Sequence, residues 1–96
     1  MTSASWHKTT FSPADLHGDV ESKLIDDFMT SFLVNENPKG MALFCCGDDL
    51  QEKTYYISKE SVNFLTHFKI NYQAEPCDEP DMQNIKFVAG TLNHAD

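Results

Sequence analysis

The chain has 96 residues, of which fifteen are aspartate or glutamate, seven are lysine and none is arginine, so its formal net charge is -8. Arginine is the side chain that most often holds phosphate groups and base edges, so this composition argues against direct nucleic-acid binding. An apolar fraction of 41%, with no apolar run near the roughly 20 residues that cross a bilayer, predicts one folded domain and no membrane segment.

Residues 1–11 are rich in small and hydroxyl side chains and show no clear period, so we predict a flexible N-terminal arm. The same residues lack the basic start and the apolar stretch of a signal peptide, and we expect a cytoplasmic protein. One domain is predicted over residues 12–90, followed by a short tail at residues 91–96.

Residues 12–34 carry the signals of a helix. Ser12-Pro13-Ala14-Asp15 combines a capping hydroxyl, a proline at the first helical position and an acid three residues after the cap. Glycine is costly inside a helix, so Gly18 predicts a separate first turn, with Asp19 capping the main helix. Apolar side chains recur every four residues and predict one buried face, namely Leu16, Val20, Leu24, Phe28 and Phe32, with Ile25, Met29 and Leu33 in the adjoining row.

A hairpin is predicted after the turn signals of residues 35–40. The continuous apolar run Met41–Cys46 favours a strand buried on both faces. Lys53–Ile57 has the aromatic and β-branched content of a second strand, and the intervening residues contain the Gly and Asp of a turn.

A second helix is capped by Ser58 and is predicted to end near Lys69. Residues 70–74 alternate like a strand, whereas two prolines and four acids make residues 75–81 an exposed loop. Residues 84–89 predict the last strand.

The predicted order α-β-β-α-β-β indicates an α+β domain in which two helices pack on one face of a small, mainly antiparallel sheet. The other face of so small a sheet often stays open. It is therefore a candidate for partner binding or self-association.

Three cysteines and four histidines raise the question of a metal site. Cys45 and Cys46 are adjacent and would point to opposite faces of a strand, and no pair of ligands has the spacing of a zinc site. We therefore predict reduced thiols, with this pair used as small hydrophobes and Cys77 in a polar loop, and no bound metal or cofactor. The acids at residues 48–52 and 75–81 lack the register of a calcium loop.

No catalytic motif is present, since the chain has no G-x-S-x-G turn, no H-E-x-x-H helix and no glycine-rich phosphate loop. Asp49, Glu52 and Lys53 have a faint likeness to a metal nuclease, but such an enzyme needs more cations to hold a phosphate backbone. We therefore do not expect an enzyme.

The acid surplus is the feature that points most directly to a function. Exposed acids keep any small domain in solution, but a negative array also imitates nucleic-acid charge and docks on the basic surface of a partner protein. We interpret the chain as a non-enzymatic protein-binding module, most concretely an inhibitor of this kind. The predicted partner-binding carboxylates are Asp15, Asp19, Asp26, Asp27, Asp48, Asp49, Glu52, Asp78, Glu79 and Asp81, with Tyr55, Tyr56 and Trp6 as aromatic anchors where they are exposed.

A second interpretation is a homo-oligomeric structural or chaperone-like domain. Its open sheet face would then pair with a second copy, with Tyr55, Tyr56 or Phe87 in the interface, and the acids would only solubilise the chain. The two interpretations differ in whether the carboxylates gather in one place and whether an apolar patch is exposed.

Overall fold

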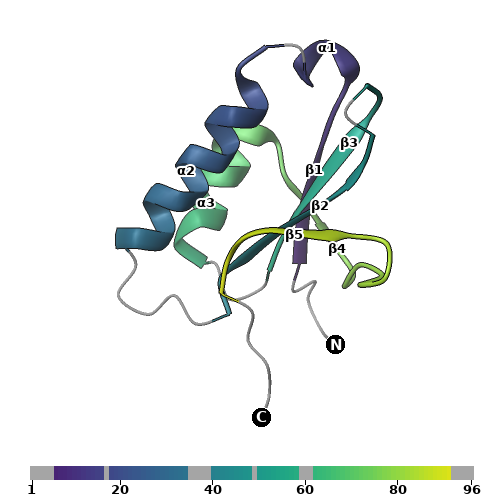
Figure 1. Cartoon of the computed structure of the whole chain (residues 1–96). Helices are drawn as coiled ribbons and strands as arrows, with labels where there is room; N and C mark the ends of the chain where they lie inside the picture. The colour runs from purple at the N-terminus through teal and green to yellow at the C-terminus, as the bar shows by residue number, and fades with distance from the viewer. Residues whose placement is uncertain (1–5, 17, 35–39, 49, 59–61, 92–96) are drawn as a thin grey trace.

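Figure 1 shows a computed structural model of the chain, which describes residues 6–16, 18–34, 40–48, 50–58 and 62–91. Its elements are β1 (Trp6–Phe11), α1 (Pro13–Leu16), α2 (Val20–Val34), β2 (Ala42–Gly47), β3 (Lys53–Ile57), α3 (Val62–Tyr72), β4 (Glu75–Cys77) and β5 (Lys86–Gly90). Among the described residues, no helix has the length and apolar character needed to cross a bilayer.

The strands form one sheet in the order β4-β1-β3-β2-β5, and every neighbouring pair is antiparallel. Strands β1 and β2 therefore run parallel on either side of β3, and α1 and α2 connect them. Strands β3 and β4 flank β1 in the same way and are connected by α3.

These two interleaved units have the β-α-β-β-α-β connectivity of ferredoxin-like domains, with β5 added beside β2. This connectivity supports many unrelated activities and does not by itself indicate a function.

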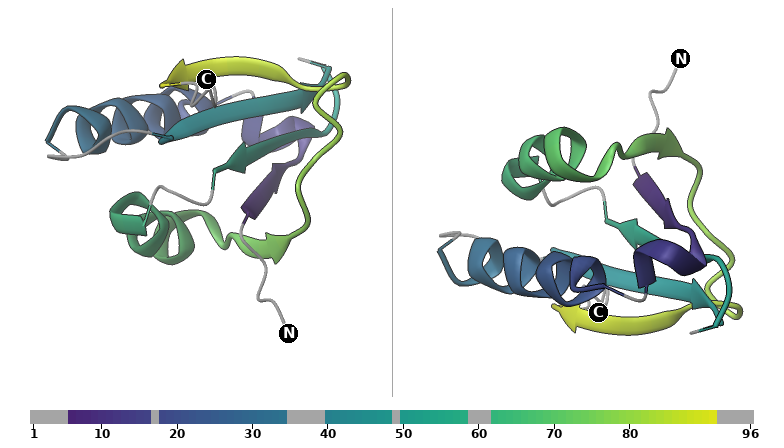
Figure 2. Two further views of the ribbon diagram at one scale, coloured as in Figure 1. Left: turned by 90° about the horizontal axis from the view of Figure 1, so that it is seen from below. Right: turned by 90° about the horizontal axis from the view of Figure 1, so that it is seen from above.

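Both long helices pack on the same face of the sheet, as predicted (Figure 2). Their apolar side chains form the core with the inward side of the strands, and Leu24, Phe28, Phe64 and Phe68 are fully buried. The α+β class and the antiparallel sheet predicted from the sequence are confirmed.

The predicted start of the first helix is also confirmed. Asp15 N donates to Ser12 Oγ at 3.3 Å, and Ser12 N donates back to Asp15 Oδ2 at 3.2 Å. These reciprocal bonds are a capping box. The helix then breaks at Gly18 and Asp19 before α2 begins at Val20. Leu33, which was predicted in the row adjoining the buried face, is 75% exposed, whereas Met29, one turn earlier in that row, packs against the core.

The N-terminal segment differs from the prediction, because Trp6–Phe11 forms β1 instead of a flexible arm. This strand lies between β3 and β4, with His7 opposite Ile57 and Phe11 opposite Lys53. Its inward side chains are His7, Thr9 and Phe11, of which only the last is strongly apolar. The alternation of apolar and polar residues that identifies a strand is therefore weak in this segment. Residues 1–5 and 92–96 lie outside the described residues.

The end of α3 also differs from the prediction. The helix continues to Tyr72, so most of the segment predicted as a strand is helical, and Gln73 follows with a left-handed φ of 52°. The short strand β4 then falls within the predicted loop. Pro76 is accepted there because β4 is an edge strand and needs no amide on its outer side.

The face of the sheet away from the helices is partly occupied. The connection from β4 to β5, residues 78–85, runs on that side from one edge of the sheet to the other (Figure 2). Phe44 is 5% exposed there and contacts Trp6 and Phe87, with ring centroids 5.8 and 5.7 Å away. This face is therefore less open than the sequence suggested.

Candidate partner-binding surface

The carboxylates divide clearly by exposure. Apart from Glu21 and Asp27, every carboxylate side chain that the structure describes belongs to an exposed residue. One group, which we call the hairpin-end carboxylates, consists of Asp15, Asp19, Asp48 and Glu52. A second group, the crossover carboxylates, consists of Glu75, Asp78, Glu79 and Asp81 on β4 and the connection to β5. Asp26 lies exposed on α2, and Asp49 lies outside the described residues.

The hairpin-end carboxylates come from distant parts of the sequence. Strand β1 ends at Phe11 opposite Lys53, the first residue of β3, so α1 begins next to the turn between β2 and β3. Figure 1 shows α1 and this turn at the same end of the domain. The fold therefore places the acids before α2 and the acids of the hairpin turn at the same end of the domain.

Two hairpin-end carboxylates are held in place by backbone groups. The capping box described above fixes Asp15, and Leu50 N donates to Asp48 Oδ1 at 2.9 Å within the hairpin turn. Neither bond involves a lysine, and both residues are exposed.

The ammonium group of Lys53 is paired with the carboxylate of Glu21 and is not exposed beside the hairpin-end carboxylates. Lys53 Nζ lies 2.5 Å from Glu21 Oε2, and the lysine side chain is only 11% exposed. The hydroxyl of Tyr55 donates to the same carboxylate oxygen. Glu21 is thus an internal anchor between α2 and β3, and nothing in the sequence distinguished it from the exposed acids.

The structure corrects the prediction that Tyr55 belongs to the partner-binding site. Tyr55 is 1% exposed and packs edge-on against Phe11, with ring centroids 5.7 Å apart, so it belongs to the core and presents nothing to a partner. Burial, followed by the hydrogen bond to Glu21, raises the pKa of its hydroxyl well above the usual range. Its inward position follows from its place opposite Thr9 and Cys45 on the helix-covered side.

Asp27 is likewise engaged within the fold. It is half-buried on α2, and its Oδ2 accepts a hydrogen bond from the Tyr72 hydroxyl at 2.6 Å. Lys23 Nζ lies 3.4 Å from the same oxygen. This carboxylate fastens α2 to the end of α3, so it is a poorer candidate for partner contact than its neighbour Asp26.

Tyr56 and Trp6 lie on the face of the sheet that carries Phe44, opposite the helices. Both side chains are half-buried. Burial and the nearby thiols of Cys46 and Cys77 raise the pKa of Tyr56. The described members of the predicted partner-binding set are therefore divided between this face, the hairpin end, the crossover and α2, and Tyr55 lies in the core.

The thiols and histidines do not gather into a metal site in the part of the chain that the structure covers. No group of three His, Cys, Asp or Glu side chains there is placed to hold an ion. His7 is buried in β1 and its Nδ1 has no described hydrogen-bond partner, and burial together with nearby Lys69 lowers its pKa. His17 and His94 lie outside the described residues.

Thiol labelling in the folded protein should follow burial. Cys45 is 9% exposed, whereas Cys46 and Cys77 are half-buried. We expect a water-soluble thiol reagent to modify the two half-buried thiols first and Cys45 only on unfolding, because burial raises the pKa of that thiol and blocks access to it. The measurement is the number of thiols labelled with time, with Cys45→Ala as the control that removes the slow phase. Rapid labelling of all three thiols would contradict the described packing of β2.

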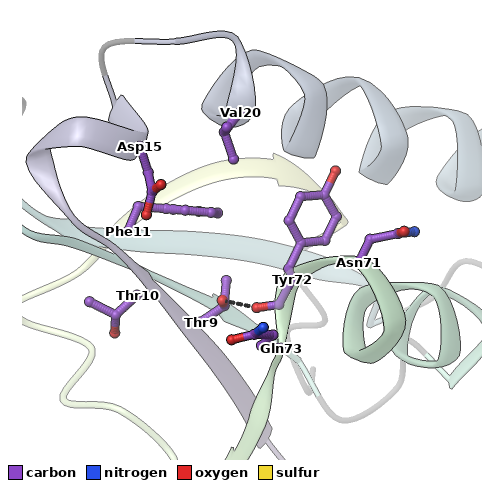
Figure 3. Close-up of a pocket in the computed structure, with 8 residues that line it drawn as sticks. All are labelled: Thr9, Thr10, Phe11, Asp15, Val20, Asn71, Tyr72 and Gln73. Carbon is purple, nitrogen blue, oxygen red and sulfur yellow. Dashed lines mark hydrogen bonds between the residues drawn. The ribbon is translucent and has the colours of Figure 1, made fainter.

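A pocket of about 280 Å³ opens beside the hairpin end (Figure 3). It is bounded by the second half of β1, by Asp15 of α1, by Val20 at the start of α2, and by the end of α3. Phe11 and Tyr72 form its apolar floor, where their rings are nearly perpendicular and 6.3 Å apart. The pocket has no local signal in the sequence, since its walls come from four elements.

Comparisons with protein-family models, with curated proteins and with solved structures found no match to this chain. The functional interpretation therefore depends on the charges, contacts and shape of the surface itself.

Proposed function

We propose that the chain is a non-enzymatic protein-binding module whose hairpin-end carboxylates occupy a basic surface of a partner protein. The observation that supports this most strongly is the contrast between paired and unpaired acids. The ion pairs in the described part of the chain use Glu21 and Asp27, and none uses a hairpin-end carboxylate. These acids stay available to a partner, and complementary charge speeds encounter and selects orientation.

The fixed positions of Asp15 and Asp48 favour an inhibitor that imitates nucleic-acid charge. A basic protein groove recognises phosphates at set spacings, and carboxylates held by a capping box and a tight turn lose little freedom when they dock. The absence of arginine supports the same view, since the chain has no guanidinium group with which to bind nucleic acid itself.

A homo-oligomer remains the alternative, and one observation favours it. Strand β5 is an edge strand, and Phe87 on it is 45% exposed. A second copy could pair along this edge through main-chain hydrogen bonds. In that case the apparent mass would depend on protein concentration, and Phe87→Lys would abolish the dependence while Asp19→Asn would leave it unchanged.

The charge proposal is tested by the rate of association with a basic partner captured from an extract of the source cells. The triple variant Asp19→Asn, Asp48→Asn and Glu52→Gln should associate about tenfold more slowly at low salt, because three steering charges are removed. The rate of the unchanged chain should fall as salt is added, since exposed charges are screened over about 8 Å at physiological ionic strength.

The matched control removes the same charge from the crossover, as Glu75→Gln, Asp78→Asn and Glu79→Gln. Its association rate should fall less than that of the hairpin-end variant if the hairpin end faces the partner. Equal losses in both variants would show that only net charge matters. Rates indifferent to salt and to both variants would remove the proposal. Circular dichroism confirms that each variant is folded.

A further inference from the structure

We propose that the pocket beside the hairpin end receives an arginine side chain of the basic partner, with Asp15 as the carboxylate that pairs with its guanidinium group. This inference rests on the proposed function and extends it from a charged surface to one anchoring contact. Basic surfaces meet acidic ones over a broad area, whereas a pocket selects a single side chain and fixes the register of the complex.

The pocket is large enough for one long side chain. Its volume of about 280 Å³ is close to the lower end of the range of about 300–1,000 Å³ typical of pockets that enclose small-molecule ligands. Phe11 and Tyr72 on the floor and Val20 on the wall offer apolar contact to the methylene stem of a long side chain.

Asp15 is prepared to accept a cation. Its Oδ2 accepts hydrogen bonds from Ser12 N and Ser12 Oγ, both at 3.2 Å. Its Oδ1 has no partner among the described residues, and Figure 3 shows the carboxylate pointing over Phe11 toward the pocket. One oxygen therefore orients the group while the other stays available to a charged donor.

The opposite side of the pocket is also electron-rich. It is formed by Asn71, Tyr72 and Gln73 at the C-terminal end of α3, where the helix dipole places partial negative charge. None of the described residues that line the pocket is a lysine or histidine. Asp15 on one side and the end of α3 on the other therefore favour a cation over an anion.

The arrangement of acceptors favours guanidinium over ammonium. Asp15 and Gln73 lie on different sides of the pocket. A guanidinium group has five donors spread in one plane and can serve more than one acceptor, whereas an ammonium group concentrates three donors at a point. The floor is held rigid because Tyr72 donates its hydroxyl to Asp27 and accepts at its carbonyl from Thr9.

The test uses N-acetyl-arginine amide as the probe, titrated into the folded chain and followed by the backbone amide signals in proton–nitrogen NMR spectra. Saturable shifts are expected at residues 9–15 and 71–73. N-acetyl-citrulline amide, which has the same shape without the charge, should bind at least about tenfold more weakly, as expected for loss of a charge-assisted hydrogen bond. Equal binding of the citrulline derivative, or of N-acetyl-lysine amide titrated in the same way, would overturn the assignment to guanidinium.

Three variants separate the pocket from general surface charge. Asp15→Asn keeps an oxygen for the capping box and should weaken arginine binding about tenfold. Val20→Phe keeps every charge but fills the pocket, and it should abolish the localised shifts. Asp26→Asn, away from the pocket on α2, should change nothing. Each spectrum reports directly whether the variant is folded.

Shifts that survive Val20→Phe would show that the probe follows surface charge and would overturn the pocket assignment. The proposed function would still stand in that case, because it depends on the partner's response to salt and to the hairpin-end variant. Conversely, localised arginine binding with no effect of the hairpin-end variant on partner association would retain the pocket and remove the broader charge proposal.

Discussion

Replacing Phe28 with alanine is expected to lower the free energy of unfolding by about 3–5 kcal/mol, a large share of the stability of a domain this size. Phe28 is fully buried on α2. Its ring meets Phe64 of α3 edge-on at 5.1 Å and stacks on Phe32 at 6.4 Å. The alanine variant would leave a cavity where the two helices and the sheet meet, and neither helix can move in to fill it without losing its own contacts.

The measurement is denaturant unfolding followed by circular dichroism, with two controls on the same helix. Phe32→Ala removes a ring of the same size from a half-buried position and should cost clearly less. Leu33→Ala changes a side chain that is 75% exposed and should stay within about 0.5 kcal/mol of the parent. Equal losses at Phe28 and Leu33 would mean that the buried face of α2 is assigned incorrectly.

Local signals predicted the first helix and the hairpin well, and the second helix except for its end. The capping box at Ser12, the break at Gly18 and the four-residue apolar row depend on neighbours within one or two turns, so they act in any context. The strand pair β2 and β3 was predicted from a short turn between apolar runs. Such signals can be recognised without knowledge of the tertiary contacts, although the packing of the apolar face supplies most of the stability.

The elements that were not predicted depend on partners distant in sequence. Strand β1 is buried through His7 and Thr9, whose polar side chains gave no hydrophobic period. The last turn of α3 forms because Tyr72 packs on Phe11 and bonds to Asp27, contacts that span more than forty positions. A preference for alternation at residues 70–74 was overruled by this packing.

The sequence predicted which kinds of residue make up the candidate site but not how these residues are arranged in space. Exposure of most acids follows from the cost of burying charge, so the hairpin-end set could be named in advance. The internal roles of Glu21 and Asp27 could not, because each depends on a tyrosine from another element. The pocket depends on four elements meeting and had no local signal.

The second large effect is expected at Tyr55, where replacement by phenylalanine should cost about 1.5–3 kcal/mol. The ring would still fill the core, but its hydroxyl would no longer donate to the Glu21 carboxylate. Glu21 would keep Lys53 as a partner, so the loss should stay below that of breaking the ion pair itself. Tyr72→Phe is the matched variant, because its hydroxyl donates to Asp27 in the same manner.

The same hydroxyl makes a prediction about alkaline pH. Burial and the bond to Glu21 raise the pKa of Tyr55 in the folded protein, whereas in the unfolded chain it stays near 10. Below pH 10 the hydroxyl is protonated in both states and its contribution to stability is complete. Above pH 10 the unfolded chain loses the proton first, so this contribution falls by about 1.4 kcal/mol per pH unit.

Because other tyrosines, lysines and thiols also titrate in this range, the informative quantity is the difference between the parent and Tyr55→Phe. Their free energies of unfolding should differ by a constant amount between pH 7 and 9 and should converge as the pH rises above about 10, since the phenylalanine variant has no proton to lose at this position. Urea unfolding at each pH measures both curves. A difference that stays constant up to pH 11 would mean that the Tyr55 hydroxyl ionises equally easily in the folded protein, and the buried bond to Glu21 would have to be abandoned.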